Sequence, residues 1–217
     1  MFFIAKDGVK IAADFYNAEK PAGWCVLIHM MPAVKESWRD FAMELQKYNY
    51  ESLAIDLRGH GESDFGPNGY LDFSDEKHQK GILDLEAAID YLIKEKRAIP
   101  DKIILIGASI GANLALQYIQ EHPEFKAGIL LSPGLNYYGI ETEPLVKNLK
   151  SGQKVFFISS KDDERSGGNN AEMNQKLYDL TPVEVKRKIQ IYETAGHGTD
   201  ILKNNQELTK IIINFIS

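Results

Sequence analysis

A serine between small residues marks the point where a strand-forming run of this chain gives way to a helix. The stretch "LIGASIGANLALQYI", residues 105–119, is centred on Gly107-Ala108-Ser109-Ile110-Gly111. Turning from strand to helix within a residue or two strains the backbone, and the glycines let the two elements approach. The hydroxyl would stand at a helix N-terminus, where N–H groups and the helix dipole favour developing negative charge. Small residues also occur at such junctions for packing alone, so Ser109 is a candidate nucleophile that needs supporting residues.

A serine hydroxyl needs a base, because it is a weak nucleophile at neutral pH. Of the five histidines, His197 in "TAGHGTD" follows the last predicted strand and lies between two glycines. These glycines let the loop fold sharply and aim an imidazole back over the sheet, although the same pattern can be a plain turn. His60, in the glycine-flanked loop "DLRGHGES", is the chief rival. We expect His78 and His122 to be solvated or capping residues, and His29 ends an apolar run.

The base in turn needs an acid that fixes its tautomer and stabilises the imidazolium. After the apolar run "KVFFISS" comes "KDDERSGG", with two adjacent carboxylates at a predicted strand end. Asp163 is the predicted acid and Asp162 the alternative, since only one of the pair can point at the histidine. The other is expected to cap or to pair with Arg165. We predict no metal here, because neither a histidine nor a third acid accompanies the pair.

The length and composition are those of an ordinary globular protein. The 217 residues, 44% hydrophobic and 26% charged, suit a single domain over residues 1–217. A net charge of -6 argues against nucleic acid and anionic membranes as partners. Cys25, the single cysteine, lies in an apolar run and is expected to be a buried hydrophobe. Without a signal peptide or a long apolar stretch, a cytoplasmic location is the expectation.

Short apolar runs alternate with helical patterns along the chain. The first two runs predict an antiparallel pair turning at Asp7-Gly8, and most of the later ones are almost continuously apolar, as in parallel strands covered on both faces. The eight runs are "MFFIAKD", "KIAADFY", "WCVLIHM", "SLAIDL", "KIILIGA", "AGILLSP", "KVFFISS" and "KIQIYET". This order predicts an α/β fold with a mostly parallel sheet of about eight strands and helices on both faces. Ligands bind such sheets at the carboxyl ends of the strands, where the candidate residues fall.

Four helices are predicted between and after these runs. The segment 37–48 opens with Ser37 and Asp40 in a capping-box arrangement, and residues 81–94 carry apolar side chains at helical spacing. A helix follows Ser109, and the tail 199–216 forms the last one. Thr199 and Asp200 are interpreted as its N-terminal cap.

With these residues in view, the sequence resembles the α/β-hydrolase superfamily. The superfamily's nucleophile, acid and histidine follow in that chain order, as Ser109, Asp163 and His197 do here. "DLRGHGES", residues 56–63, is similar to its loop after the fourth strand, and "LIHMMPA", residues 27–33, stands where its histidine-glycine loop follows the third. The resemblance runs from about residue 2 to the C-terminus. It implies that His60 supports loop structure and that His29 braces the oxyanion loop, so that neither is the base.

The chain departs from the superfamily directly after His29, where Met30 replaces the common glycine. The resemblance implies an oxyanion hole built from the backbone N–H groups of Ile110 and, in this loop, Met31. Because backbone groups do the binding, the methionine side chains need not prevent it. We expect them to shape the acyl pocket instead.

The resemblance implies a serine hydrolase that cleaves small carboxylic esters without a cofactor. Only about twenty residues, 133–154, separate two strand runs where superfamily members often insert a lid, so we expect no lid domain. Substrate-binding walls are predicted at Met30, Leu135 and Tyr137, although Leu135, Tyr137 and Tyr138 are equally compatible with ordinary packing. The alternatives are a related thioesterase or deacetylase, or a non-hydrolytic protein that binds a ligand or partner. The expected partner is a small ester, and the chain is expected to be a monomer or homodimer.

Overall fold

An eight-stranded sheet forms the centre of the computed structural model, which describes residues 1–165 and 167–217. Its strands are β1 (Phe2–Ile4), β2 (Lys10–Tyr16), β3 (Gly23–Ile28), β4 (Tyr50–Ile55), β5 (Ile103–Ala108), β6 (Ala127–Leu131), β9 (Lys154–Ser160) and β12 (Lys186–Tyr192). They are ordered β1-β2-β4-β3-β5-β6-β9-β12. The pairs β1–β2 and β2–β4 are antiparallel, and the other five pairs are parallel. The predicted α/β fold with a mostly parallel sheet is confirmed.

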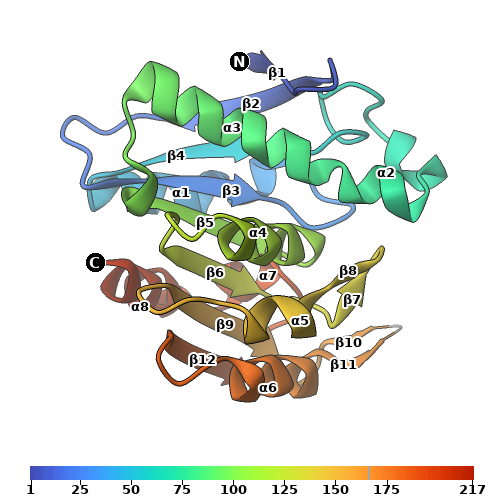
Figure 1. Ribbon diagram of the computed structural model, residues 1–217, viewed down its shortest axis with the longest axis vertical. Helices are drawn as coiled ribbons and strands as arrows, with labels where there is room; N and C mark the ends of the chain where they lie inside the picture. Colours follow the sequence, from blue (N-terminus) through green and yellow to red (C-terminus); the bar gives the residue numbers. More distant parts are fainter. Residues whose placement is uncertain (166) are drawn as a thin grey trace.

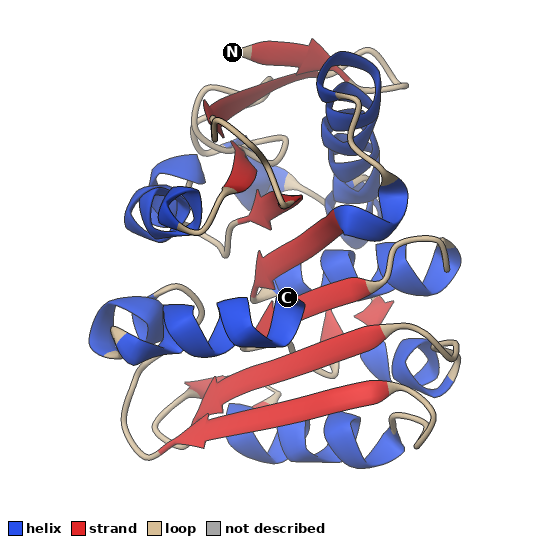
Figure 2. Ribbon diagram, turned by 90° about the vertical axis from the view of Figure 1, so that its left-hand side faces the viewer, coloured by secondary structure: helices blue, strands red, loops and turns tan. Residues whose placement is uncertain are grey.

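Helices cover both faces of this sheet (Figure 1). One layer holds α1 (Arg39–Lys47), α7 (Asp200–Asn204) and α8 (Glu207–Ile216), and the other holds α3 (Gly81–Lys96), α4 (Ile110–Glu121), α5 (Thr142–Lys147) and α6 (Asn170–Leu180). Figure 2 shows the sheet between the two layers. Every residue of β3, β4, β5 and β6 is buried, because these central strands face helices on both sides. Cys25 is buried in β3, as expected.

Two small hairpins project where the parallel strands end (Figure 1). One pairs β7 (Asn136–Tyr137) with β8 (Ile140–Glu141), and the other pairs β10 (Glu164–Arg165) with β11 (Gly168–Asn169). Residues 132–153, all of which the structure describes, hold only β7, β8 and α5 as regular elements, so no lid domain lies there. The remaining elements are α2 (Asp75–Gln79) and short 3-10 helices at Lys35–Trp38, Gly69–Asp72 and Pro100–Lys102.

In the first part of the chain, the structure corrects two local predictions. The turn between β1 and β2, predicted as a two-residue turn at Asp7-Gly8, is a three-residue loop: the Ala5 N–H donates to the Val9 carbonyl, and Gly8, at φ 86°, completes the reversal. Ser37 does not cap α1: it lies inside the 3-10 helix Lys35–Trp38, and its buried hydroxyl has no hydrogen-bond partner in the described residues. The capping box fails because Asp56, distant in sequence, accepts the Lys35 N–H at 2.7 Å and fixes this turn.

The predicted C-terminal helix is broken into α7 and α8. Asn205, at φ -138° and ψ 82°, interrupts it, and its side-chain amide donates back to the Ile201 carbonyl at 3.0 Å. The Thr199 side chain makes no capping hydrogen bond, which corrects the prediction of a Thr199–Asp200 cap. Instead, Asp200 pairs with Lys203 at 2.9 Å. Among the described residues, every helix is too short or too polar to span a membrane.

Candidate active site

Ser109 occupies a strained turn between β5 and α4. Its φ of 55° and ψ of -121° are rare for a residue with a side chain, and its N–H donates to the Leu131 carbonyl of the neighbouring strand at 2.8 Å. A Cβ at Gly107 would lie 2.1 Å from the Gly111 carbonyl oxygen, and one at Gly111 would lie 2.4 Å from the Ile28 carbonyl oxygen. Both glycines are therefore required by close backbone approach, as the sequence indicated.

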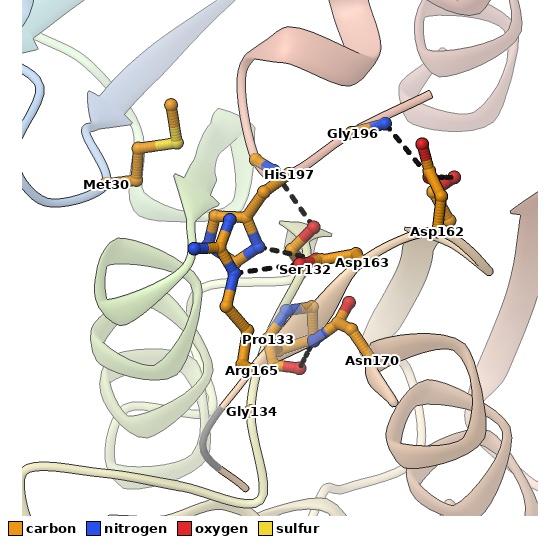
Figure 3. A network of polar contacts seen from close by, with 12 residues as sticks. Met30, Ser132, Pro133, Gly134, Asp162, Asp163, Arg165, Asn170, Gly196 and His197 are labelled. Atoms are coloured by element: carbon orange, nitrogen blue, oxygen red, sulfur yellow. Dashed lines mark hydrogen bonds and ion pairs between the residues drawn. The ribbon is translucent and has the colours of Figure 1, made fainter. Parts of the chain in front are cut away.

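His197 lies in the loop between β12 and α7, and its ring meets Asp163 at the end of β9. The distance from His197 Nδ1 to Asp163 Oδ2 is 2.5 Å, and both side chains are almost fully buried (Figure 3). Gly198 N–H donates to the Ser132 hydroxyl at 2.9 Å, which fixes the loop against the segment after β6. The bond at Nδ1 leaves Nε2 of the ring as the nitrogen available to a nucleophile.

The two adjacent carboxylates make different contacts. Asp162 Oδ1 accepts hydrogen bonds from the Ser160 hydroxyl and from the N–H groups of Ala195 and Gly196, at 3.1 and 3.2 Å for the last two. These bonds lower the pKa of the Asp162 carboxyl and hold the loop that carries His197. Arg165 contacts the other carboxylate: its Nε lies 2.8 Å from Asp163 Oδ1. Of the two roles expected for the carboxylate that does not face the histidine, pairing with Arg165 is wrong, whereas Asp162 does cap backbone N–H groups, those of Ala195 and Gly196.

One pocket contains both Ser109 and His197. Its lining comes from the loop after β3, the turn between β5 and α4, the two hairpins and the loop after β12. The lining residues are Met31, Ser109, Ile110, Asn136, Tyr137, Tyr138, Glu164, Arg165 and His197. Of the three predicted walls, Tyr137 is present. Met30 and Leu135 are not among its lining residues: Met30 packs against Gly198 and beside the Thr199 hydroxyl, while Leu135 packs against the core and lines a different hollow.

This pocket is more polar than the sequence suggested. Asn136, Glu164 and Arg165 were missed because they lie on two-residue strands that carry no periodic signal. Glu164 and Arg165 could have been proposed from the sequence, because they directly follow the candidate acid Asp163.

The loop after β3 brings Met31 to the lining of the pocket, and it is tied to the loop after β4. His29 Nδ1–H donates to the Met30 carbonyl at 2.9 Å, and its Nε2 accepts the Leu57 N–H at 3.0 Å. Both bonds require the neutral ring, and burial lowers the pKa of His29 to about 4. Throughout the described chain, no protein acceptor takes the N–H of Met31 or of Ile110. The role of these two groups as an oxyanion hole stays a prediction.

The remaining histidines are engaged in packing. The buried His60 ring stacks on Tyr70 at 4.1 Å and lies 4.8 Å from the His29 ring, between ring centres. His78 is also buried, 3.9 Å from the Tyr138 ring, so the expectation that it is solvated is wrong; the aromatic neighbour comes from the distant β7–β8 hairpin. His122 caps the C-terminus of α4, as expected. No group of three or more metal-binding side chains occurs within the described ranges.

Comparison with known proteins agrees with this fold. A family model described as "Serine aminopeptidase, S33" matches residues 19–176. The esterase Pf2001 of Pyrococcus furiosus superposes with a TM-score of 0.80 at 19% identity, covering 100% of this chain and 90% of that one. Est1E of Butyrivibrio proteoclasticus, solved with ferulic acid, gives 0.77 at 17% identity, covering 100% and 99%. At these identities the likeness concerns the fold.

Curated relatives match over parts of the chain. Prolyl oligopeptidase A of Galerina marginata is 38% identical over 80 residues, which are 37% of this chain and 11% of that protein. A probable alcohol acetyltransferase of Cyberlindnera fabianii is 25% identical over 116 residues, 52% of this chain and 28% of the relative. A multifunctional-autoprocessing repeats-in-toxin of Vibrio cholerae is 33% identical over 90 residues, 40% of this chain and 2% of the toxin. The matches therefore span a small part of each relative's length.

Proposed function

The chain belongs to the serine aminopeptidase S33 family of α/β hydrolases, and from this premise we propose that it is a serine hydrolase cleaving small carboxylic esters through an acyl-enzyme on Ser109. One observation carries the proposal: His197, hydrogen-bonded to Asp163 at 2.5 Å, lines the same pocket as the strained Ser109. A nucleophile, a base and an orienting acid in series are the groups that acyl transfer needs. In this proposal residues 1–217 act as one α/β-hydrolase domain.

The mechanism follows from the contacts of each group. Asp163 holds the His197 ring with its proton on Nδ1, so that Nε2 can take the proton of the Ser109 hydroxyl as the oxygen attacks the ester carbonyl. The N–H groups of Met31 and Ile110 stabilise the tetrahedral oxyanion, each for about 2.7 to 4 kcal/mol. His197 then protonates the leaving alcohol, and water repeats the sequence on the acyl-enzyme to release the acid.

The walls of the pocket support small substrates with polar character. The β7–β8 and β10–β11 hairpins form one side with Asn136, Tyr137, Glu164 and Arg165. No lid lies over the pocket from residues 132–153, where superfamily lids are often inserted. A short acyl chain on a fairly soluble alcohol suits such a site better than a long lipid chain.

The test is hydrolysis of p-nitrophenyl acetate by wild type and by Ser109→Ala. We expect the substitution to lower kcat by about 10⁴-fold or more, because it removes the nucleophile. A fluorophosphonate should add covalently to the wild type and not to the variant, as measured by intact mass. Equal activity of the two proteins, with no labelling, would exclude the proposal and favour a non-hydrolytic binding protein.

Cleavage of an amide is a second candidate, because the family description names an aminopeptidase and Glu164 is among the residues that line the pocket. A carboxylate beside the nucleophile could bind the free ammonium group of a peptide N-terminus. A panel of p-nitrophenyl esters, thioesters and aminoacyl p-nitroanilides separates these functions. A kcat/KM for an anilide above that of the matched ester would favour the aminopeptidase, and a preference for the ester the primary proposal.

A further inference from the structure

The carboxylate of Asp163 is shared between two partners. Its Oδ2 contacts His197 Nδ1 at 2.5 Å, while its Oδ1 accepts a hydrogen bond from Arg165 Nε at 2.8 Å. Figure 3 shows the guanidinium of Arg165 beside the imidazole, with both directed at the same carboxylate. The Asp163 side chain is 1% exposed and that of Arg165 is 46% exposed, so the ion pair reaches from the buried acid to solvent.

The backbone around Asp163 holds Arg165 in this place. The Arg165 strand β10 pairs with β11, and the Asn170 N–H donates to the Asp163 carbonyl at 2.9 Å, closing the base of the hairpin. The Asn170 side chain then donates to the Pro133 carbonyl at 2.9 Å, which ties the same segment to the loop after β6. Asp163 and Arg165 thus belong to one fixed unit.

Because the Asp163 carboxylate also interacts with Arg165, it stabilises the protonated form of His197 less strongly. Although burial raises it, the hydrogen bonds and charges of His197 and Arg165 hold the pKa of Asp163 below its ordinary value. The carboxylate therefore stays ionised, but its single negative charge is largely balanced by the guanidinium. An imidazolium beside this pair is stabilised less than beside a lone carboxylate.

Other charged or titratable groups lie on the elements around His197. Asp162 bonds to the backbone of the loop, Glu164 and the Tyr137 hydroxyl belong to the pocket, and Asp200 begins α7. Arg165 is the single lysine or arginine among the described residues that line the pocket. It is thus the cation there that opposes protonation of the ring.

We propose that Arg165 is a positioning residue, which fixes the orientation of Asp163 through Oδ1 and sets the lower pH limit of activity by keeping His197 in its neutral form. This inference rests on the proposed serine hydrolase function. It assigns to the β10–β11 hairpin a role in tuning the base, beyond forming the rim of the pocket.

The experiment compares Arg165→Gln, Arg165→Lys and a matched control, Lys161→Gln. Lys161 also follows β9 and is exposed, but its ammonium pairs with Glu193 at 2.6 Å rather than with Asp163. The readout is the midpoint of the acid limb of kcat/KM against pH for the neutral substrate p-nitrophenyl acetate. The pKa of His197 is also measured directly, by NMR of protein with ¹³C-labelled histidines, and its signal is assigned by its loss in His197→Gln.

Removing the cation favours the imidazolium. The midpoint of the acid limb of kcat/KM and the midpoint of the His197 NMR titration should therefore both rise by about 0.5 to 1 unit in Arg165→Gln. The shift should shrink in high salt, since the guanidinium is half exposed. kcat above the midpoint should fall about three- to tenfold because Asp163 loses its anchor. Arg165→Lys keeps the charge and should keep the midpoint within about 0.3 unit, whereas Lys161→Gln should match wild type.

An unchanged His197 midpoint in Arg165→Gln would overturn the proposal, even with a lower kcat, because the role would then be structural. The proposal would also be overturned if the effect of Arg165→Gln were confined to a higher KM for an anionic ester. Arg165 would then be a substrate-binding residue. If wild type shows no Ser109-dependent hydrolysis, the proposed function fails. The NMR titration still decides whether Arg165 controls His197.

Discussion

At the scale of single residues, the neighbours Asp162 and Asp163 differ in burial and in what they contact. We expect Asp163→Asn to lower kcat by about 10⁴-fold, because the amide cannot stabilise the imidazolium and favours the wrong tautomer. Asp162→Asn is the matched control: its amide oxygen can still accept the N–H groups of Ala195 and Gly196, so kcat should change less than about threefold. Steady-state kinetics with p-nitrophenyl acetate measures both, and the reverse pattern would show that Asp162 is the acid.

The residues near the chemistry were predictable to different degrees from the sequence. Ser109 and His197 lie between glycines at strand ends, and this local pattern predicts their positions in the fold. The ion pair between Arg165 and Asp163 joins residues two positions apart, so their proximity was visible in the sequence, but which of the two adjacent carboxylates Arg165 contacts was not. Met30 was assigned to the pocket from its place in the sequence, but its sulfur packs against Gly198, which is distant in the chain.

At the scale of elements, helix α4 holds the β7–β8 hairpin through one buried side chain. Asn113 Nδ2 donates to the Ile140 carbonyl at 3.0 Å, and its Oδ1 accepts the Gly134 N–H at 3.1 Å. These bonds clamp both ends of the segment that carries Tyr137 into the pocket. The nucleophile and this wall are therefore positioned by the same helix.

Removal of this clamp should affect both stability and binding. We expect Asn113→Ala to lower the free energy of unfolding by about 2 to 4 kcal/mol, because it leaves a buried N–H and a buried carbonyl unpaired. KM should rise more than kcat falls, since the Tyr137 wall loosens while Ser109 stays in place. Urea unfolding and ester kinetics measure the two effects. Gln117→Ala, on the same helix, is the control, because the Gln117 side chain makes an exposed bond to Glu121, and an equal loss in both variants would contradict the clamp.

Elements were predictable where burial is continuous and less so where the fixing contact is remote. The eight runs all form strands of one sheet, and the four central strands β3, β4, β5 and β6 are buried along their whole length. The start of α1 was misjudged because the Asp56 carboxylate, rather than Ser37, organises the turn before it. The small hairpins were missed because two-residue strands are stabilised by tertiary contacts such as those of Asn113.

At the scale of the whole molecule, the strand order brings the candidate groups together. The order β3-β5-β6-β9-β12 places the loops that carry Met31, Ser109, Tyr137, Asp163 and His197 at successive carboxyl ends of parallel strands. Alternation of strand and helix predicted the sheet, and its parallel direction predicted the edge at which the site lies. The sequence alone does not specify how closely side chains from five separate loops approach, because that depends on packing of the complete fold.

Stability of the whole molecule should depend on pH through its buried histidines. Burial, with a smaller contribution from His29, lowers the pKa of His60 to about 3, whereas an unfolded chain has a value near ~6.5. The unfolded state therefore binds the proton first, and the stability contributed by neutral His60 is complete above about pH 7 and lost as the pH falls below about 6.5. At pH 5 this loss is about 2 kcal/mol.

His60→Phe removes this titration while keeping a ring to stack on Tyr70. The variant loses the contact of Nδ1 with the Arg58 carbonyl at 3.1 Å, which lowers its stability at every pH. Between pH 7.5 and pH 5, however, its free energy of unfolding should fall by about 2 kcal/mol less than that of wild type. Urea unfolding at the two pH values measures this difference. The same fall in both proteins would mean that His60 takes up its proton equally in the folded and unfolded chain, contrary to its burial between His29 and Tyr70.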